Sequence, residues 1–317
     1  MKANILQLNP ILIAAINDKL NSLYTVHRLF EQTDKDAYLR EHGPTIRAVI
    51  TGGHTGITRA MMAQLPALQV VAVNGVGTDA VDLEYARARG LPVTGTFGAL
   101  TEDVADLAVG LLIATCRGMC SGDRFIRAGD WVRNPQPSAI PLARRVSGMR
   151  VGIVGMGRVG RAVAARMAAF GCPIAYTDLK AMHDVPHTFV AGLVQLARQS
   201  DALILAAAAD QAEGIVDAEV LDALGKDGYL INIARGRLVK EDDLVAALTA
   251  GRIAGAGLDV FVDEPNVPQA LFALDNVTLQ AHRASATHQT RAAMGEMVLA
   301  SIAQALAGQR PEFSLTT

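Results

Sequence analysis

The sequence predicts an α/β fold in which two doubly wound parallel sheets form two domains. Three observations predict this fold class. The chain has 317 residues, more than the roughly 250 to 300 at which a single hydrophobic core usually stops growing. Short apolar runs alternate with helix-like stretches along most of its length. One of these runs leads directly into a G-x-G-x-x-G turn at residues 155–160.

The first hundred residues have a βα pattern of their own. Short apolar segments predict strands at 4–8, 24–29, 46–51, 68–74 and 92–96. Helix-like stretches at 58–64 and 82–89 lie between some of them. A long helical segment is predicted from Thr101 to about Ala128, and the proline-rich residues 134–141 then form a connection. The glycine motif therefore begins a second series of strands and helices.

The second series starts with the apolar run 151–154 before the glycines. A helix is predicted at 161–170, closed by Gly171, and a strand at 173–176 then leads to Asp178. Further strands are predicted at 202–205, 229–233, 254–258 and 277–279, with helices at 218–224 and 241–250. This alternation is typical of a doubly wound parallel sheet.

The glycine motif predicts a dinucleotide-binding turn. Gly155 allows the tight turn, Gly157 lets backbone amides approach a pyrophosphate, and Gly160 lets the next helix pack closely on its strand. The positive end of that helix then faces the phosphate charge. Asp178 follows Gly160 at nearly the spacing of roughly 20 residues expected for a carboxylate that binds the adenosine ribose hydroxyls.

Three reactive side chains each follow a predicted strand of the second series. Arg235, Glu264 and His282 lie beyond the carboxyl ends of three strands, where open α/β sheets bind ligands. An arginine offers a planar fork to a carboxylate or carbonyl group. A histidine exchanges a proton near neutral pH, and a glutamate on its second nitrogen orients the ring and favours its protonated form. Together they predict a catalytic group.

Composition excludes several other classes of protein. The formal net charge of −2 and the lack of long basic runs give no footprint for nucleic acid. The longest apolar run, 107–116, is well short of the roughly 18 residues that a membrane span needs. The first residues lack the arrangement of a signal peptide, so we expect a cytoplasmic protein that does not bind a membrane.

The cysteines and histidines predict no metal site. Cys116, Cys120 and Cys172 have no C-x-x-C spacing, and the first two lie one helical turn apart, which favours packing in the core. His183 and His187 bracket a proline that argues against a helix, so we expect a solvated loop there.

The motifs together resemble the D-isomer-specific 2-hydroxyacid dehydrogenases and are most similar to the glyoxylate/hydroxypyruvate reductase branch. The resemblance spans nearly the whole chain. It rests on NGVGTD at 74–79, LTEDVAD at 100–106, the glycine motif at 155–160, NIARG at 232–236 and GLDVFVDEP at 257–265.

The resemblance implies two Rossmann-like domains, with a cofactor domain inserted into a substrate domain. Residues 1–100 plus 287–317 would form the substrate (catalytic) domain, and residues 101–286 the dinucleotide-binding domain. The segment around Thr101 to Ala128 would be part of the contact in a homodimer.

The resemblance also implies a role for individual residues. Arg235, Glu264 and His282 would be catalytic, and the backbone amides of Val76 and Gly77 would hold the substrate carboxylate, with Arg235 and His282 also contacting the substrate. The residues implied to bind the cofactor are Gly155, Gly157, Arg158, Val159, Gly160, Asp178, Ile233, Ala234 and Asp259, the last through the nicotinamide amide.

The implied activity is that of an oxidoreductase. A hydride would pass from the reduced nicotinamide to C2 of a 2-oxo acid such as glyoxylate or hydroxypyruvate, and the reverse reaction would oxidise a D-2-hydroxy acid. Asp178 favours NAD, because its carboxylate repels a 2′-phosphate, whereas nearby Lys180 leaves NADP open. The alternative is an NAD(H)-sensing binding protein of the same fold with little turnover.

Some positions depart from the family pattern or stay ambiguous. Ala281 replaces the usual proline before His282, and Arg283 follows it, either facing the site or, as we expect, pointing outward. His54 faces the substrate or lies exposed in a loop. Trp131 reaches a partner subunit or, as we expect, anchors the connecting segment.

Another departure lies beside the expected cofactor site. Residues 206–210 lack a proline that is frequent there, and Glu213 replaces a frequent basic residue, so cofactor affinity is expected to differ from that of relatives.

Overall fold

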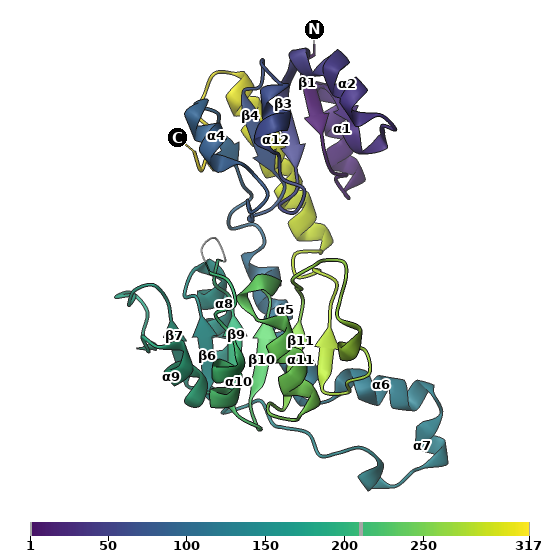
Figure 1. Ribbon diagram of the computed structural model, residues 1–317, viewed down its shortest axis with the longest axis vertical. Coiled ribbons are helices and arrows are strands. Elements are labelled where there is room, and N and C mark those ends of the chain that lie inside the picture. Colours follow the sequence, from purple (N-terminus) through teal and green to yellow (C-terminus); the bar gives the residue numbers. More distant parts are fainter. Residues whose placement is uncertain (1, 209–211, 317) are drawn as a thin grey trace. The chain divides into compact units, whose positions relative to one another are not determined.

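The chain folds into two units, and each unit is built on one parallel β-sheet (Figure 1). Unit 1 consists of Met1–Leu100 and Ala286–Thr317, and unit 2 consists of Thr101–Ser285. Unit 2 is therefore inserted into the sequence of unit 1. The computed structural model describes residues 2–208 and 212–316. The predicted α/β class with two Rossmann-like parallel sheets is confirmed.

Unit 1 contains a five-stranded sheet in the order β2-β1-β3-β4-β5, in which all neighbours are parallel. Its strands are β1 (Asn4–Gln7), β2 (Thr25–Arg28), β3 (Ile46–Thr51), β4 (Val70–Val73) and β5 (Val93–Thr94). Its helices are α1 (Ala14–Leu23), α2 (Lys35–His42), α3 (Arg59–Ala63), α4 (Leu83–Ala88) and α12 (His288–Leu306), with short 3-10 helices η1 (Leu29–Glu31) and η2 (Gly43–Thr45).

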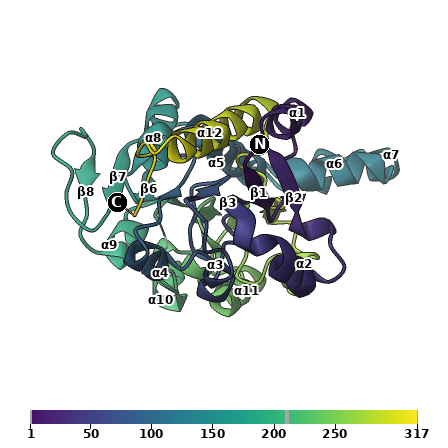
Figure 2. The ribbon, with the colours of Figure 1, turned by 90° about the horizontal axis from the view of Figure 1, so that it is seen from above.

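Alternate residues of these strands pack on opposite faces of the sheet in unit 1. On one face, Ile5 and Ile50 pack with α1 and with Val298 of α12, and the two helices lie side by side (Figure 2). On the other face, Leu6 and Val49 pack with α2, α3 and α4. The central strands β3 and β4 are therefore buried on both faces, which explains their largely apolar sequences, whereas the edge strand β2 stays partly exposed.

Unit 2 contains a seven-stranded sheet in the order β12-β11-β10-β9-β6-β7-β8, again with all neighbours parallel. Its strands are β6 (Val151–Val154), β7 (Ile174–Thr177), β8 (Thr188–Phe189), β9 (Ala202–Leu205), β10 (Tyr229–Asn232), β11 (Gly255–Leu258) and β12 (Val277–Leu279). Its helices are α5 (Thr101–Cys116), α6 (Met119–Arg127), α7 (Asp130–Arg133), α8 (Arg158–Ala169), α9 (Leu193–Arg198), α10 (Ala218–Leu224) and α11 (Glu241–Thr249), with 3-10 helices η3 (Pro137–Ala139), η4 (Gly236–Leu238) and η5 (Gln269–Leu271).

Helices cover both faces of the sheet in unit 2. Helices α5 and α8 pack together on one face, and α9, α10 and α11 form a row on the other (Figure 1). A Cβ added at Gly257 would lie 3.0 Å from the Cβ of Leu111, and one at Gly255 would lie 3.0 Å from Cγ2 of Thr115. Helix α5 thus approaches β11 closely because these two strand positions carry no side chain.

The prediction of one long helix from Thr101 to Ala128 is wrong. Helix α5 ends at Cys116, Gly118 has a left-handed φ of 56°, and α6 then starts in a new direction. Glycine takes this conformation at little cost, so the apolar pattern continues while the backbone turns. Helix α6 buries none of its residues, and α6 and α7 extend away from the rest of unit 2 (Figure 2).

Two further predictions are wrong because α6 and α7 extend away from the rest of unit 2. Cys116 is buried as expected, but Cys120 lies in α6 and is exposed. Trp131 in α7 keeps 58% of its surface exposed, so it does not anchor the segment as expected.

No single helix within residues 2–208 and 212–316 has the length and apolar character to cross a membrane. In the part of the chain that the structure describes, α5 and α6 pass this test only when taken together, and they are bent by 60° with respect to each other.

Candidate active site

The glycine motif forms the turn between β6 and α8. Gly155 has a φ of 92°, and a Cβ there would lie 2.5 Å from Cα of Ala207. A Cβ at Gly160 would lie 2.0 Å from the carbonyl oxygen of Gly155, so the first turn of α8 packs directly on the loop. By contrast, a Cβ at Gly157 would meet no atom within 4 Å. The space beside Gly157 is open, as a backbone that receives a ligand requires.

The start of α8 fits an anionic group. Gly157 is the N-cap residue and makes no capping bond through a side chain. Arg158 is exposed in the first turn, where a cation opposes the positive end of the helix unless an anion is also present. A pyrophosphate would accept the N–H groups of this turn and compensate that charge. The residues present therefore fit a dinucleotide cofactor.

Asp178 lies directly after β7 and connects to the glycine turn. Its Oδ2 accepts the backbone N–H of Met156 at 2.7 Å, and its Oδ1 accepts that of Leu179 at 2.7 Å. The side chain of Arg161 donates to the carbonyl oxygen of Met156 at 3.1 Å and pairs with Asp184 at 2.7 Å. The carboxylate is thus held beside the glycine turn, and its contact with the ribose hydroxyls stays a prediction.

A buried asparagine shapes the loop that carries Arg235. Asn232 ends β10 with 1% of its surface exposed. Its amide donates to the carbonyl oxygen of Arg235 at 2.9 Å, and its Oδ1 accepts the N–H of Ala234 at 3.1 Å. Ile233 and Ala234 are buried. The chain thereby leaves the sheet in one defined conformation, which places Arg235 beyond the carboxyl end of β10.

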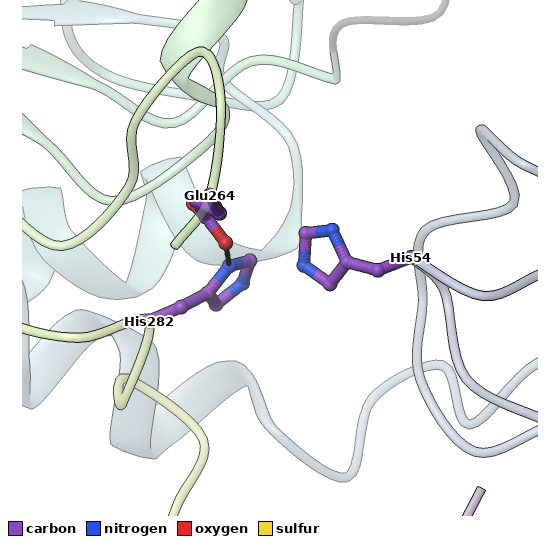
Figure 3. Close-up of side chains that lie close together, drawn as sticks. All are labelled: His54, Glu264 and His282. Carbon is purple, nitrogen blue, oxygen red and sulfur yellow. Dashed lines mark hydrogen bonds and ion pairs between the residues drawn. The ribbon is translucent and has the colours of Figure 1, made fainter. Parts of the chain in front are cut away.

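Glu264 and His282 meet in unit 2 although they follow different strands. Oε2 of Glu264 lies 2.8 Å from Nδ1 of His282 (Figure 3). Oε1 of Glu264 accepts the N–H of Phe261 at 3.0 Å. Both side chains are partly buried, with 20% and 31% of their surfaces exposed. The carboxylate therefore fixes the orientation of the imidazole ring.

Asp259 holds the backbone around His282. His282 has a φ of 52°, which is unfavourable for a residue with a side chain. Its N–H donates to the carbonyl oxygen of Asp259 at 2.8 Å. The Asp259 carboxylate accepts the N–H groups of Arg283 at 2.7 Å and Ala284 at 3.0 Å. Three successive N–H groups are thus bound by one residue.

The environment of Asp259 is apolar as well as hydrogen-bonded. The residue is fully buried, and burial raises the pKa of its carboxyl, although the N–H groups of Arg283 and Ala284 act in the opposite direction. Its predicted contact with the nicotinamide amide stays a prediction, because the carboxylate has no exposed surface and already accepts two bonds.

Unit 1 carries the residues expected to bind the substrate carboxylate. Val76 and Gly77 lie in the loop after β4. A Cβ at Gly53 would lie 2.8 Å from the carbonyl oxygen of Gly77, so this loop packs backbone to backbone on the loop after β3. His54, also drawn in Figure 3, is exposed in that second loop. Two loops at the carboxyl edge of the sheet thus support each other.

Other sequence expectations have mixed outcomes. The side chain of Arg283 is exposed, and His183 lies exposed in a loop. Part of the segment 206–210 lies outside the described residues. Sequence reasoning gave no role to Asn232, although a polar residue at the end of an apolar strand was a signal for one. It also missed that Asp259 accepts the backbone N–H groups of residues 282–284.

Comparison with known proteins identifies a family for unit 2 and relatives for the whole chain. The model of the D-isomer specific 2-hydroxyacid dehydrogenase NAD-binding domain matches residues 109–284. The 2-ketogluconate reductase of Gluconobacter oxydans is 43% identical over 300 residues, covering 94% of each chain. The glyoxylate/hydroxypyruvate reductase A of Arabidopsis thaliana is 40% identical over 295 residues, covering 93% of each chain.

Solved structures are similar over nearly the full length. A 2-hydroxyacid dehydrogenase from Ketogulonicigenium vulgare gives a TM-score of 0.91 at 41% identity, covering 99% of this chain and 98% of that one. An NADPH-dependent glyoxylate/hydroxypyruvate reductase from Sinorhizobium meliloti, in complex with NADP and malonate, gives 0.89 at 36% identity, covering 99% and 97%.

Proposed function

The chain belongs to the D-isomer-specific 2-hydroxyacid dehydrogenase family, and from that premise we propose that it reduces glyoxylate and hydroxypyruvate. The protein is an NAD(P)-dependent oxidoreductase for small 2-oxo acids. The observation that carries the proposal is the contact of 2.8 Å between Glu264 and His282, in the same unit as the glycine turn. An imidazole held by a carboxylate beside a nicotinamide site is suited to proton transfer.

The proposed mechanism assigns one role to each side chain. When bound, the nicotinamide supplies the hydride that reduces C2 of the substrate. His282, protonated and oriented by Glu264, gives its proton to the carbonyl oxygen. Arg235 stabilises the negative charge that develops on this oxygen and also binds the carboxylate. The backbone N–H groups of Val76 and Gly77 are the further proposed donors to the carboxylate.

We propose NADH as the preferred cofactor, with Gly157, Arg158, Val159 and Gly160 at the pyrophosphate. The proposal is supported by Asp178, whose carboxylate is fixed by the N–H groups of Met156 and Leu179. A fixed negative charge at the end of β7 repels a 2′-phosphate and accepts ribose hydroxyls. The relative from Sinorhizobium meliloti is described as NADPH-dependent, so both cofactors belong in the test.

A second substrate class follows from one comparison. The 43% identical relative is a 2-ketogluconate reductase, whose substrate is a longer 2-oxo acid. A pocket discriminates between substrates that differ by one carbon by only about 1 to 3 kcal/mol of free energy. Short and long 2-oxo acids must therefore be compared directly. Initial rates with glyoxylate, hydroxypyruvate, pyruvate, phenylpyruvate and 2-ketogluconate, each with NADH and with NADPH, test the proposal.

We also propose a homodimer in which residues 119–142 contact the partner. Large apolar side chains on this segment are exposed, and such a concentration is typical of an interface. They are Met119, Ile126, Trp131, Val132, Ile140 and Leu142. Light scattering of the wild type and of a Val132→Asp, Leu142→Asp double variant tests this, with a monomer expected only for the variant.

We keep the cytoplasm as the proposed location. The thiols of Cys116, Cys120 and Cys172 are all free, as is usual in a reducing compartment. Fractionation of cells that express the full chain tests the location.

The relatives named above are reductases and dehydrogenases, which favours an enzyme over an NAD(H)-sensing binding protein.

A further inference from the structure

Two successive backbone N–H groups, those of Phe261 and Val262, bind two carboxylates from different elements. The N–H of Phe261 donates to Oε1 of Glu264 at 3.0 Å. The next N–H, that of Val262, donates to Oε1 of Glu241 at 3.2 Å. Glu264 lies in the loop after β11, whereas Glu241 begins α11. The loop of a proposed catalytic residue is therefore attached to α11 by a side chain that has no role in the mechanism above.

The peptide between Phe261 and Val262, whose N–H binds Glu241, also packs on the loop of Arg235. A Cβ added at Gly236 would lie 1.9 Å from the carbonyl carbon of Phe261 and 2.4 Å from the nitrogen of Val262. Only glycine allows this approach of two backbones, because any side chain would overlap the peptide. The backbone next to Arg235 thus rests directly on the loop that leads to Glu264.

The surroundings of Glu241 indicate that it acts through its hydrogen bond to Val262 and not only through its negative charge. Glu241 is partly buried, and burial raises the pKa of its carboxyl. The nearby carboxylates of Asp242 and Asp263 act in the same direction, and the bond from the N–H of Val262 acts against them. Asp242 shares the first turn of α11 and is exposed, so proximity to the positive end of the helix does not distinguish the two residues. What distinguishes Glu241 is its bond to Val262.

We propose that Glu241 is a positioning residue for the reductase reaction: its carboxylate holds the Phe261–Val262 peptide against Gly236. This contact fixes Glu264, and through it His282, relative to the backbone of Arg235. The inference rests on the catalytic roles proposed for these three residues. Without the bond, the loop gains freedom at Val262, directly after the residue whose N–H binds Glu264. A displacement of about 1 Å in such a group can lower turnover by up to about 10²-fold.

Three substitutions separate the bond from the charge. Glu241→Ala removes both, Glu241→Asp keeps the charge but shortens the side chain, and Glu241→Gln keeps an acceptor oxygen at the same reach. Asp242→Ala is the matched control, because it removes a charge from the same helical turn without touching the loop. For each variant, kcat and KM are measured with hydroxypyruvate, together with cofactor Kd and Tm.

We expect Glu241→Ala and Glu241→Asp to lower kcat by about tenfold, with KM and cofactor Kd within about twofold of the wild type. Glu241→Gln should recover most of kcat, and Asp242→Ala should match the wild type. The proposal is overturned if Glu241→Asp keeps the wild-type kcat, if Glu241→Gln is as slow as Glu241→Asp, or if Asp242→Ala is equally slow. The Asp variant decides the matter even if Glu241→Ala does not fold.

The same set of assays distinguishes failure of this inference from failure of the proposed function. His282→Ala is assayed in parallel. A slow His282→Ala with a fast Glu241→Asp removes only the role of Glu241. A wild-type rate in His282→Ala instead contradicts the proposed catalytic group.

Discussion

Oε2 of Glu264 lies 2.8 Å from Nδ1 of His282, while Oε1 of the same carboxylate accepts the backbone N–H of Phe261. The two oxygens therefore bind two different groups, and the carboxylate cannot rotate without losing one of them. An imidazole held in this way keeps its proton on Nδ1, which leaves Nε2 as the nitrogen that exchanges a proton with substrate.

Replacement of the carboxylate by an amide tests this relationship. Glu264→Gln keeps the shape of the side chain but removes the negative charge that stabilises a protonated imidazole. We expect kcat/KM to fall by about 10²-fold with little change in cofactor affinity. Steady-state kinetics and a fluorescence titration with the cofactor measure both quantities. Asp263→Asn, an exposed neighbour, is the control, and an equal loss in that variant would contradict the specific role of Glu264.

Removal of the Asp259 carboxylate tests the support beneath His282. Asp259→Ala leaves the N–H groups of Arg283 and Ala284 without their acceptor, and His282 must keep its φ of 52° with less support. We expect stability to fall by about 2 kcal/mol or more and kcat to fall with it. Denaturant unfolding and kinetics are the measurements. A variant with unchanged stability and turnover would show that the loop holds its conformation without Asp259.

Asp178 is expected to decide between the two cofactors. In Asp178→Asn, the charge that repels a 2′-phosphate is gone, although the amide oxygen still accepts one of the two backbone N–H bonds. We expect the ratio of kcat/KM with NADPH to that with NADH to rise by about tenfold or more. Parallel assays with both cofactors provide the ratio. Asp184→Asn, which alters the nearby ion pair with Arg161, is the control. A constant ratio in Asp178→Asn would contradict the assignment.

The lowered pKa of His27 in unit 1 leads us to expect that stability depends on pH. Nδ1 of His27 contacts the Tyr38 hydroxyl at 2.8 Å, Nε2 contacts Asn4 at 3.2 Å, and the His42 ring lies 4.9 Å away between centroids. Burial, and then the charge of His42, lower the pKa of His27 below its ordinary 6.5. Tyr38 itself has a raised pKa, chiefly through burial and then through Glu41, so it is neutral in this range.

The sign of this effect follows from proton linkage. Below pH 6.5 the unfolded chain binds a proton at this histidine more readily than the folded chain does, so stability falls as the pH drops towards the lowered value. We expect His27→Gln to show a smaller fall in Tm than the wild type between about pH 7.5 and pH 5.5. His183→Gln, at an exposed loop position, is the control. An unchanged pH dependence in His27→Gln would assign the effect to other groups.

Strand and glycine patterns predicted much of the fold because they depend on local rules. Buried parallel strands such as β6 and β9 appear as continuous apolar runs, and Gly155 and Gly160 are required by a turn whose backbones touch. Helix α1 was not predicted, because it buries only Ile16 and Leu20 and its pattern is weak. The break at Gly118 was also missed, since one glycine in an apolar stretch is compatible with a continuing helix.

The site could be predicted only as far as strand ends define it. The pairing of Glu264 with His282 followed from the shared sheet edge and from the family resemblance. The bonds from Asp259 to Arg283 and Ala284 and from Glu241 to Val262 depend on how loops fold back on one another. Sequence spacing carries no direct signal for such contacts. In each case a buried or partly buried carboxylate accepts a backbone N–H from a loop that is distant in the sequence.

The most direct test of the central claim is the initial rate of NADH oxidation with hydroxypyruvate, measured side by side for the wild type and His282→Ala. Nicotinamide absorbance reports the rate, and circular dichroism and cofactor titration verify that the variant is folded and binds NADH. We predict rapid turnover by the wild type and a loss of about 10²-fold or more in the variant. Equal rates in the two proteins would contradict the proposed role of His282 as proton donor.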